Sequence, residues 1–449
     1  MDGNVLPSKL LSRLSKAAGL IRSHNFIQVY SHYDADGLSA AGIVANVLLR
    51  ENKEFRITTF TTLDEESMHE IRECEYDCIL LTDLGASYIE ELEKLGKDII
   101  VLDHHTVQCD SEEICYANPH LVDIDGSFGA CGATMAFLFG IMVDEKNWDL
   151  VQIAFAGIAG DKQHIKGIIG LNEYLLREGT KRGFITTSEG SLIPPGPISR
   201  SLYYSTEPYI RGVTGDQAAV DRMLADAKIS ADKLSVNFTD DEKRRLSSII
   251  AVKLTEQGVS LDSMTELSRT RYYLKDWKMD AESMAELLDA CGRTMSQGIG
   301  IAMCLGSKDD LLRAMDLRDQ YNKSIMEASV KLDKEGLKVM DNIQYFDSTE
   351  TGFTGILCGI IMRYIGDPAK PTIGMNTADD KIKLSGRATY KQLDRGVDLS
   401  VALRDSTKTV GGEGGGHSIA SGGSIPLGTS EEFLKNIDTI IGSQINSAK

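Results

Sequence analysis

The residues of this chain best suited to chemistry are aspartates and histidines in four short motifs within its first 161 residues. In order, the motifs are His32-Tyr33-Asp34-Ala35-Asp36-Gly37, Thr82-Asp83-Leu84-Gly85, Asp103-His104-His105 and Gly157-Ile158-Ala159-Gly160-Asp161. Each motif follows a short apolar run that is typical of a buried strand or helix. Carboxylates and imidazoles delivered from the ends of such elements are what a two-metal hydrolytic site requires. Together the four motifs predict a site of that kind.

The mixture of imidazole and carboxylate groups narrows the choice of metal. Nitrogen and oxygen ligands together suit Mn²⁺, Zn²⁺ or Fe²⁺, whereas Mg²⁺ alone usually takes oxygen ligands only. Alternate residues of an extended segment point to one side, so we expect His32, Asp34 and Asp36 to converge just beyond a strand. Taken singly, an Asp-Gly pair is often a turn and a His-His pair often lies on the surface. Those alternatives would all have to hold together for the metal site to be absent.

Alternating strands and helices must carry these motifs to one place. Strands are expected over residues 26–30, 78–81 and 99–102, and helices over 38–50, 90–95, 131–143 and 148–159. This rhythm predicts an α/β fold with a doubly wound, mainly parallel sheet that is covered on both faces. In such sheets active sites gather beyond the carboxyl ends of the strands, where the first three motifs would lie. Small residues such as Gly132, Gly157 and Gly160 would allow helices to approach the site closely.

A second signal lies near the C-terminus, where glycines are dense. The segment Gly414-Gly415-Gly416-His417 follows an expected helix over 399–409, and Ser385-Gly386-Arg387 ends an expected strand over 381–384. Glycines expose backbone N–H groups and permit close approach by a phosphate or sugar. An arginine fork also suits phosphate. A flexible glycine loop is the alternative for this segment.

Bulk composition sets limits on the class of protein. The chain has 449 residues and a formal net charge of −18, which argues against a broad basic surface that coats nucleic acid. A metal-filled groove can still be locally positive inside an acidic body. None of the 8 cysteines has CxxC spacing, so we expect reduced thiols in a cytoplasmic protein. Neither a signal peptide nor a membrane span is expected.

The order of the four N-terminal motifs resembles the DHH phosphoesterase superfamily, over about residues 25–165. That resemblance implies two Mn²⁺ ions, with Mg²⁺ a possible substitute. It implies that one ion takes His32, Asp34 and Asp83. The other would take Asp36, Asp83, His104 and Asp161, so that Asp83 bridges the two. His105 would face the scissile phosphate, and Asp103 would orient its neighbours from behind the ligands.

The C-terminal motifs are similar to those of the DHH-associated domain, over about residues 340–428. The chain departs from that pattern at Ser421, where the family usually has alanine. The resemblance implies a smaller mixed-sheet α/β domain that holds a terminal nucleotide through Ser385, Arg387, Gly415, Gly416 and His417. The glycine-histidine motif argues against an inorganic pyrophosphatase, whose second domain lacks it.

The middle of the chain favours one branch of the family. Segments 193–197, 207–212 and 288–293 resemble archaeal RecJ-like nucleases, including the GINS-associated nuclease. The insert is then either a helical spacer or, over residues 190–290, a docking module for a GINS-type replication partner. We expect a DHH catalytic metal-binding domain over 1–188, a mostly helical insert over 189–305, a bridging helix over 306–340 and a DHH-associated substrate-binding domain over 341–449.

The combined motifs predict a Mn²⁺-dependent exonuclease that hydrolyses single-stranded DNA or RNA from an end, linked to DNA replication or repair. The archaeal resemblance implies a slight lean towards 3′-to-5′ digestion. One alternative is a small-nucleotide phosphodiesterase or phosphatase of the nano-RNase, phosphoadenosine-phosphate or cyclic-dinucleotide type. Another is a replication scaffold, although in such proteins decay usually removes metal ligands, and here the ligand positions are intact.

Overall fold

The computed structural model describes residues 6–378 and 380–447, and these divide into two compact units. The first unit comprises Met1–Glu189 with Thr270–Tyr321, and the second comprises Gly190–Arg269 with Asn322–Lys449. The expected insert, 189–305, is therefore shared between the two units. The expected bridging helix is α14 (Lys308–Glu335), which begins in the first unit and ends in the second.

Hydrogen bonds explain why this division departs from the expected boundaries. Residues 271–274 form a strand that pairs with residues 185–188 and so belong to the first unit. In the second unit, the Arg211 guanidinium lies 2.8 Å from the Asp333 carboxylate and donates to the Ile365 carbonyl at 3.1 Å. The helical segment 190–269 is thus tied to the C-terminal residues.

The larger sheet of the first unit has five strands, all parallel, in the order β2-β1-β3-β4-β5. The strands are β1 (Phe26–His32), β2 (Glu54–Phe60), β3 (Cys78–Thr82), β4 (Asp98–Leu102) and β5 (Cys115–Ala117). Ser31 pairs with Thr82, and Thr82 pairs with Leu102, so neighbouring strands end in register. His32, Asp83 and Asp103 consequently follow one another along a single edge of the sheet.

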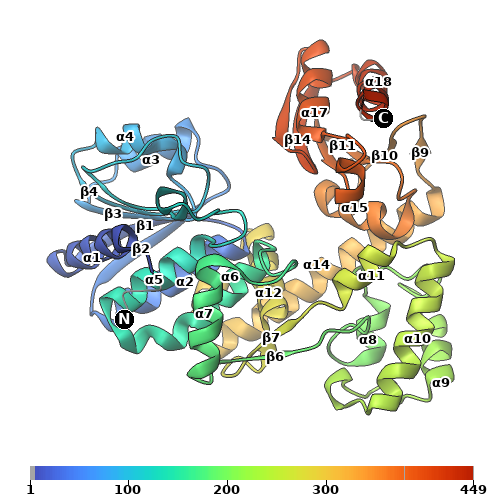
Figure 1. The fold of residues 1–449 in the computed structure, drawn as a ribbon, viewed down its shortest axis with the longest axis horizontal. Helices are drawn as coiled ribbons and strands as arrows, with labels where there is room; N and C mark the ends of the chain where they lie inside the picture. Colours follow the sequence, from blue (N-terminus) through green and yellow to red (C-terminus); the bar gives the residue numbers. More distant parts are fainter. Residues whose placement is uncertain (1–5, 379, 448–449) are drawn as a thin grey trace. The chain divides into compact units, whose positions relative to one another are not determined.

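Helices cover both faces of this sheet, as the doubly wound α/β prediction requires (Figure 1). One face carries α1 (Ser8–Ser23), α2 (Ala35–Arg50) and α5 (Gly132–Val143), and α6 (Val151–Gly160) packs against α2 and α5. The other face carries α3 (Glu65–Arg72), η1 (Ala86–Tyr88) and α4 (Ile89–Glu93). Alternate residues of each strand point into the two hydrophobic cores, one on each face of the sheet. Leu80 and Ile100 join the α2 side, whereas Ile79 and Val101 join the α3 side. Burial on both faces explains the unbroken apolar runs of β3 and β4.

The remaining elements of the first unit pack beside these helices. They are η2 (Pro119–Val122), η3 (Glu145–Leu150), α7 (Gly170–Lys181), β6 (Ile185–Ser188), β7 (Arg271–Leu274), β8 (Met279–Asp280), α12 (Ala281–Arg293) and α13 (Gln297–Cys304). The β6-β7-β8 sheet is antiparallel. At the end of α12, a Cβ atom on Gly292 would lie 2.0 Å from the Tyr33 carbonyl oxygen. This glycine lets α12 touch the first Asp/His motif.

The second unit combines helices with a mixed sheet, as predicted. Its helices are α8 (Ile198–Tyr203), α9 (Gln217–Ala227), η4 (Ser235–Asn237), α10 (Asp240–Glu256), α11 (Leu261–Leu267), α15 (Thr354–Ile360), η5 (Ile361–Ile365), α16 (Tyr390–Leu393), α17 (Leu399–Thr409) and α18 (Ser430–Ser447). Its strands are β9 (Lys338–Val339), β10 (Gln344–Asp347), β11 (Thr372–Ala378), β12 (Lys381–Arg387), β13 (Glu413–His417) and β14 (Ala420–Pro426).

The sheet order is β13-β14-β12-β11-β10-β9, in which only β10 and β11 are parallel. One face packs its apolar side chains, among them Ile373 and Leu384, against Leu403 of α17 and Phe433 of α18. The glycine-rich segment is not a loop: it forms β13 and β14, which are held by pairing with each other and with β12.

Two expectations from composition can be compared with the structure. All eight cysteines lie in the described part of the chain, and none forms a disulfide there. Among the described residues, no helix combines the length and apolarity needed to cross a membrane.

Candidate metal centre

Every Asp and His of the four N-terminal motifs that was expected to serve the site lies at the carboxyl edge of the first sheet. His32 is the last residue of β1, Asp83 follows β3, and Asp103 begins the segment after β4. Asp161 follows α6, whose C-terminal end points at the same place. Their ligand atoms form three overlapping groups: His32, Asp34 and Asp83; Asp36, His104 and Asp161; and Asp83, His104 and His105.

The first group joins the end of β1 to the start of α2. His32 Nδ1 lies 3.0 Å from Asp34 Oδ2 and 3.5 Å from Asp83 Oδ2. Asp34 is the N-cap of α2 and accepts a hydrogen bond from the Gly37 N–H at 3.0 Å. Because the helix begins at Ala35, the expected extended HxDxD segment ends after Asp34. That expectation was wrong, since the capping bond turns the chain into a helix and sends Asp36 to a different group.

The second group surrounds Asp36, which is buried with 3% of its surface exposed. Its carboxylate accepts hydrogen bonds from the N–H groups of Gly132 (2.6 Å) and Ala133 (2.9 Å) at the start of α5. His104 Nε2 lies 3.8 Å from Asp36, and His104 Nδ1 lies 3.8 Å from Asp161. The group therefore draws on three elements far apart in the sequence.

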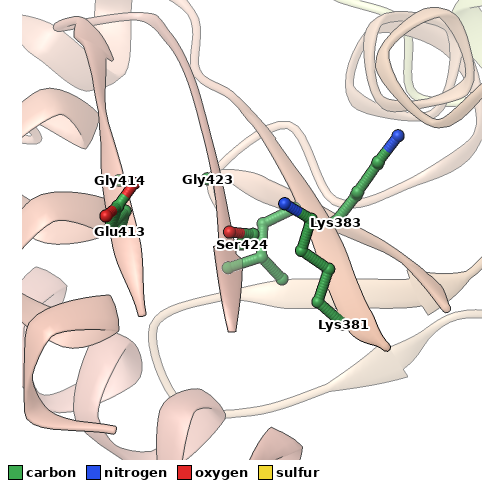
Figure 2. A pocket seen from close by; sticks show the side chains of 7 residues that line it. Lys381, Lys383, Glu413, Gly414, Gly423 and Ser424 are labelled. Carbon is green, nitrogen blue, oxygen red and sulfur yellow. The ribbon is translucent and has the colours of Figure 1, made fainter. Parts of the chain in front are cut away.

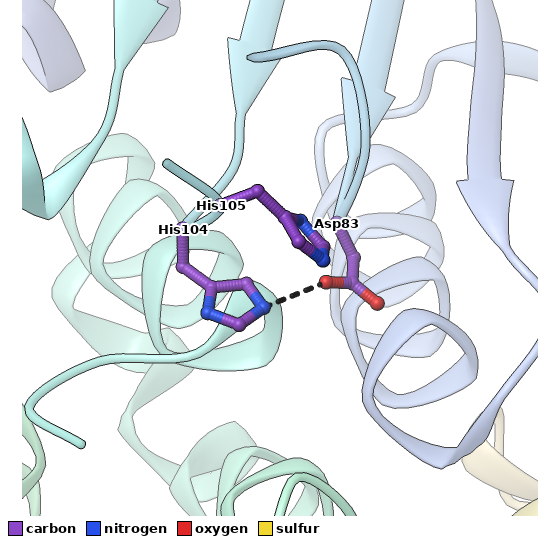
Figure 3. A group of neighbouring side chains, drawn as sticks. All are labelled: Asp83, His104 and His105. Atoms are coloured by element: carbon purple, nitrogen blue, oxygen red, sulfur yellow. Dashed lines mark ion pairs between the residues drawn. The ribbon is translucent and has the colours of Figure 1, made fainter. Parts of the chain in front are cut away.

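Asp83 belongs to two of the three groups and occupies the middle of the site. Figure 3 shows its carboxylate facing His104, whose Nε2 lies 3.2 Å from Asp83 Oδ1. The backbone of Asp83 has φ = 57°, a left-handed conformation that aspartate tolerates better than most residues. A Cβ atom at Gly132 would lie 2.5 Å from the Asp83 Cβ. Asp83 is thus held in an unusual conformation within a space that glycine leaves open.

Asp103 and His105 form a pair at the side of the site. Asp103, 1% exposed, accepts hydrogen bonds from His105 Nδ1 at 2.8 Å and from the Ala86 N–H at 2.8 Å. With Nδ1 donating, His105 presents Nε2 outward, and its side chain is 55% exposed. The geometry is that of an imidazole oriented by a buried carboxylate.

The pKa values reflect carboxylates crowded around imidazoles. Burial opposes charge on His32 and His104, but hydrogen bonds to Asp34 and Asp83 raise the pKa of His32 to about 11, and the bond to Asp83 holds the pKa of His104 well above its usual value. Burial also opposes ionisation of Asp83, yet those imidazoles keep its pKa below the usual value. Burial and the Asp83 charge raise the pKa of Asp36 well above normal.

The charges of these imidazoles and carboxylates show whether the site suits divalent cations. Protons on two imidazoles partly neutralise several carboxylates that share a small buried volume. Cations would neutralise those carboxylates more completely, and both ligand types are ones that first-row divalent metals accept. The residues therefore fit a metal centre that can hold divalent ions.

Glycines make the site compact, as expected from the sequence. A Cβ atom on Gly157 would lie 2.3 Å from the Ala133 Cβ and 2.6 Å from Asp36 Oδ1. One on Gly160 would lie 2.6 Å from the Ala35 Cβ. At these distances a methyl group would push α6 away from α2 and α5, which carry or support the ligands.

Sequence reasoning missed the residues that orient His104 and Asp161. His104 Nδ1 lies 2.8 Å from the Gly126 carbonyl, an acceptor, so Nδ1 donates and Nε2 is left to face Asp83. Gln163 donates to Asp161 at 2.8 Å and accepts from Asn172 at 2.7 Å. The only signal in the sequence was the position of Gln163, two residues after Asp161.

The C-terminal candidates also come together, within the second unit. Ser385 pairs with Gly422, which pairs with Gly415; Arg387 pairs with Ala420, which pairs with His417. Arg387 Nη1 lies 3.4 Å from the Ser385 hydroxyl, and His417 is exposed. Gly416 has φ = 134°, a backbone conformation that favours glycine. The arrangement offers a guanidinium, a hydroxyl and an imidazole on one side of a glycine floor.

Comparison with known proteins agrees with this geometry. The model of the DHH family N-terminal domain matches residues 26–158, and that of the DHHA1 domain matches residues 342–443. A relative from Methanocaldococcus jannaschii, the uncharacterised protein MJ0831, is 31% identical over 448 residues, which cover 97% of this chain and 98% of the relative. The chain belongs to the DHH superfamily. It is a RecJ-like phosphoesterase of that superfamily.

Other proteins share less of their sequence with this chain. YorK of Bacillus subtilis, described as an SPbeta prophage-derived single-strand DNA-specific exonuclease, is 28% identical over 210 residues, 40% of this chain and 34% of YorK. RecJ of Thermus thermophilus, solved with Mn²⁺, has the same fold with a TM-score of 0.61 at 17% identity, over 98% of this chain and 55% of RecJ. CDC45 of Entamoeba histolytica has a TM-score of 0.64 at 12% identity, over 96% of this chain and 99% of CDC45.

Proposed function

We propose that this DHH-superfamily chain is a Mn²⁺-dependent exonuclease that hydrolyses single-stranded DNA or RNA from an end, in DNA replication or repair. The observation that carries the proposal is the overlap of three ligand groups on Asp83 and His104 at one sheet edge. An overlap of this kind fits two neighbouring cations better than one. The similarity to YorK, an exonuclease by its description, supports nucleic acid as the substrate.

The residues divide between two cation positions. His32, Asp34 and Asp83 would hold one Mn²⁺, and Asp36, Asp83, His104 and Asp161 would hold the other, with Mg²⁺ a possible substitute. Bound there, the cations would supply a water of lowered pKa as nucleophile and stabilise charge on the phosphate in the transition state.

Side chains that do not bind metal would bind the substrate and stabilise its charge. Asp103 accepts from His105 Nδ1 and raises the pKa of His105, so that a protonated His105 would donate from Nε2 to a phosphate oxygen. In this proposal His105 would stabilise negative charge on the phosphate and would not bind metal. In the second unit, Ser385, Arg387, Gly415, Gly416 and His417 would hold the terminal nucleotide.

The test is digestion of single-stranded DNA and RNA, labelled separately at each end, with Mn²⁺ present. Asp83→Asn should lower the rate at least about a thousandfold, roughly 4 kcal/mol, since it removes the ligand shared by both cations. Asp77→Asn is the matched control, because this exposed residue precedes β3 whereas Asp83 follows it. The label released first gives the polarity, for which 3′-to-5′ is the modest expectation. Equal rates in the two variants would contradict the proposal.

A small-nucleotide phosphodiesterase or phosphatase is the competing enzyme class. It would use the same metal ligands, so Asp83→Asn does not separate the two. Oligomer length does: activity that falls steadily from a dinucleotide to longer strands would favour the small-nucleotide enzyme. A scaffold would release nothing from any substrate while still binding Mn²⁺.

A GINS-type partner docking on residues 190–290 stays a prediction. Deletion of that whole range would remove β7, β8 and most of α12 from the first unit, so point substitutions are better probes. Val236 and Leu261 are 78% and 74% exposed in the helical segment of the second unit. Capture of purified GINS by the wild type and not by Val236→Ser with Leu261→Ser would support docking there. Equal capture would contradict it.

A further inference from the structure

The C-terminal sheet has one face covered by α17 and α18 and another that is partly open. Along β12, Ile382, Leu384 and Gly386 are buried on the α17 side, where a Cβ atom on Gly386 would lie 3.0 Å from Leu403. Side chains alternate along a strand, so Lys381, Lys383, Ser385 and Arg387 share the opposite face. Lys381 and Lys383 are exposed, whereas Ser385 and Arg387 are half-buried beside α15.

The strand register extends this face over two more strands. Lys383 pairs with Ser424, which pairs with Glu413, one step along from the Ser385–Gly422–Gly415 row. A pocket of about 540 Å³ lies here, lined among others by Lys381, Lys383, Ser424 and Glu413 (Figure 2). The two lysines thus stand on the same strand as the expected nucleotide-binding residues and continue their row.

Lys381 and Lys383 carry their positive charges on the open face of the sheet. Within the part of the chain that the structure describes, neither ammonium group makes an ion pair or side-chain hydrogen bond. Two other lysines of the second unit are paired, since Lys233 lies 2.7 Å from Glu242 and Lys331 is paired with Glu350. In a chain whose formal net charge is −18, β12 thus carries two cations on one face, with Glu413 lining the same pocket.

We propose that Lys381 and Lys383 bind backbone phosphates beyond the first two nucleotides of the substrate end, so that the substrate site extends along β12. This inference rests on the proposed function. Residues two apart on a strand are about 7 Å apart, a spacing comparable with that of successive phosphates on an extended single strand. The predicted ligand is thus a strand of several nucleotides rather than a dinucleotide.

Glu413 would limit how far the bound nucleic-acid strand can spread sideways from β12. It stands on β13, separated from Lys383 by Ser424 on β14, and its carboxylate would repel phosphate (Figure 2). Charge therefore directs the backbone over β12. The small side chains of Ser424 and Gly422 leave room for sugars beside it.

Affinity as a function of strand length tests the inference. We would measure binding of fluorescein-labelled oligothymidylates of two and eight nucleotides by anisotropy, in EDTA to prevent hydrolysis. Lys381→Gln with Lys383→Gln should weaken octamer binding about tenfold at low salt and reduce the slope of log K against log salt by about 1.4. Dinucleotide binding should change less than about twofold, because the dinucleotide ends before the lysines.

The matched control is Lys408→Gln with Lys435→Gln, two exposed lysines on α17 and α18, which cover the other face. Unchanged octamer affinity in the Lys381/Lys383 variant would overturn the inference, as would equal weakening of both lengths. If the wild type still hydrolyses the octamer with Mn²⁺ in either case, the proposed function stands. A wild type that neither binds nor hydrolyses any oligomer would overturn both.

Discussion

The metal centre and the open face of the C-terminal sheet are both built from strands and glycines, yet they differ in how firmly their functional side chains are held. Asp36, Asp83 and Asp103 are at most 3% exposed, and each accepts hydrogen bonds from the backbone or from histidines. His417 and Lys383 are exposed, with no such partners among the described residues. Cations need ligands fixed in place, whereas a polymer that advances one nucleotide at a time needs contacts that release it.

The glycines of the two regions show the same contrast. Gly157 has no room for a side chain, since three helices converge on it. Gly415, in β13, has nothing within 4 Å of where its Cβ would lie. The first glycine is required by packing within the protein. The second leaves open space on the face that carries Ser385 and Arg387.

The largest effect should come from Gly157→Ala. The added methyl group would overlap Ala133 and Asp36, so α6 must shift, and we expect a loss of about 1–3 kcal/mol in unfolding free energy together with weaker Mn²⁺ binding. Urea unfolding followed by circular dichroism measures the first, and calorimetry the second.

Gly19→Ala is the control for Gly157→Ala. Gly19 also lies inside a helix, α1, but has nothing within 4 Å of its missing Cβ. Alanine there should stabilise the protein by about 0.5–1 kcal/mol, because it favours the helical backbone. If both substitutions had the same effect, the tight packing around the metal centre would not be what distinguishes it.

The next largest effect should come from Asp103→Asn, which should reduce the rate of hydrolysis about 10- to 100-fold and leave Mn²⁺ binding intact. The hydrogen bond and charge of Asp103 raise the pKa of His105. Without that charge, His105 would lose its proton at lower pH. If His105 acts as a protonated donor, activity falls as pH rises through its pKa, so the alkaline limb of the pH–rate profile should move to lower pH. An unmoved limb would exclude this role for His105.

Proton competition with the cations should give a smaller effect. Burial raises the pKa of Asp161 to about 6, so below pH 6 a cation must displace a proton from this carboxyl group. The dissociation constant for Mn²⁺ should therefore rise by an additional factor of about ten per pH unit below pH 6. Titration calorimetry from pH 5 to 7.5 measures it. Asp161→Asn should remove the added dependence, and its persistence would assign the proton to another group.

Much of the fold could be predicted because buried strands and helices have recognisable patterns of apolar residues. Strand β3 is apolar at nearly every position since both its faces are covered, and the helix expected over 399–409 has those bounds in the structure. Strand β2, by contrast, is an edge strand with polar residues, and no pattern indicated it. The glycine-rich segment was not predicted as β13 and β14, because glycine has a low strand propensity. These strands are held by pairing with each other and with β12, which the sequence does not show.

The sequence indicated which side chains gather at the edge of the first sheet, but not how they are arranged there. Strand ends indicated that His32, Asp83 and His104 would meet. They did not indicate that Asp34 caps a helix and so separates Asp36 from His32, which depends on a local hydrogen bond. Nor could spacing reveal Gln163 and Gly126 behind the ligands, because that contact arises only when distant segments fold together.

The smallest predicted effect, and the one that separates the two regions best, is that of Gly415→Ala. Its methyl group would meet no atom of the protein, so the free energy of unfolding should change by less than about 0.5 kcal/mol. It would stand on the face shared by Ser385 and Arg387 and hinder close approach of a sugar or phosphate. We expect KM for an octanucleotide to rise a few-fold with kcat little changed. A loss of stability like that of Gly157→Ala would mean that Gly415 is packed as tightly as Gly157. Unchanged KM and unchanged stability would mean that Gly415 is not part of the substrate site.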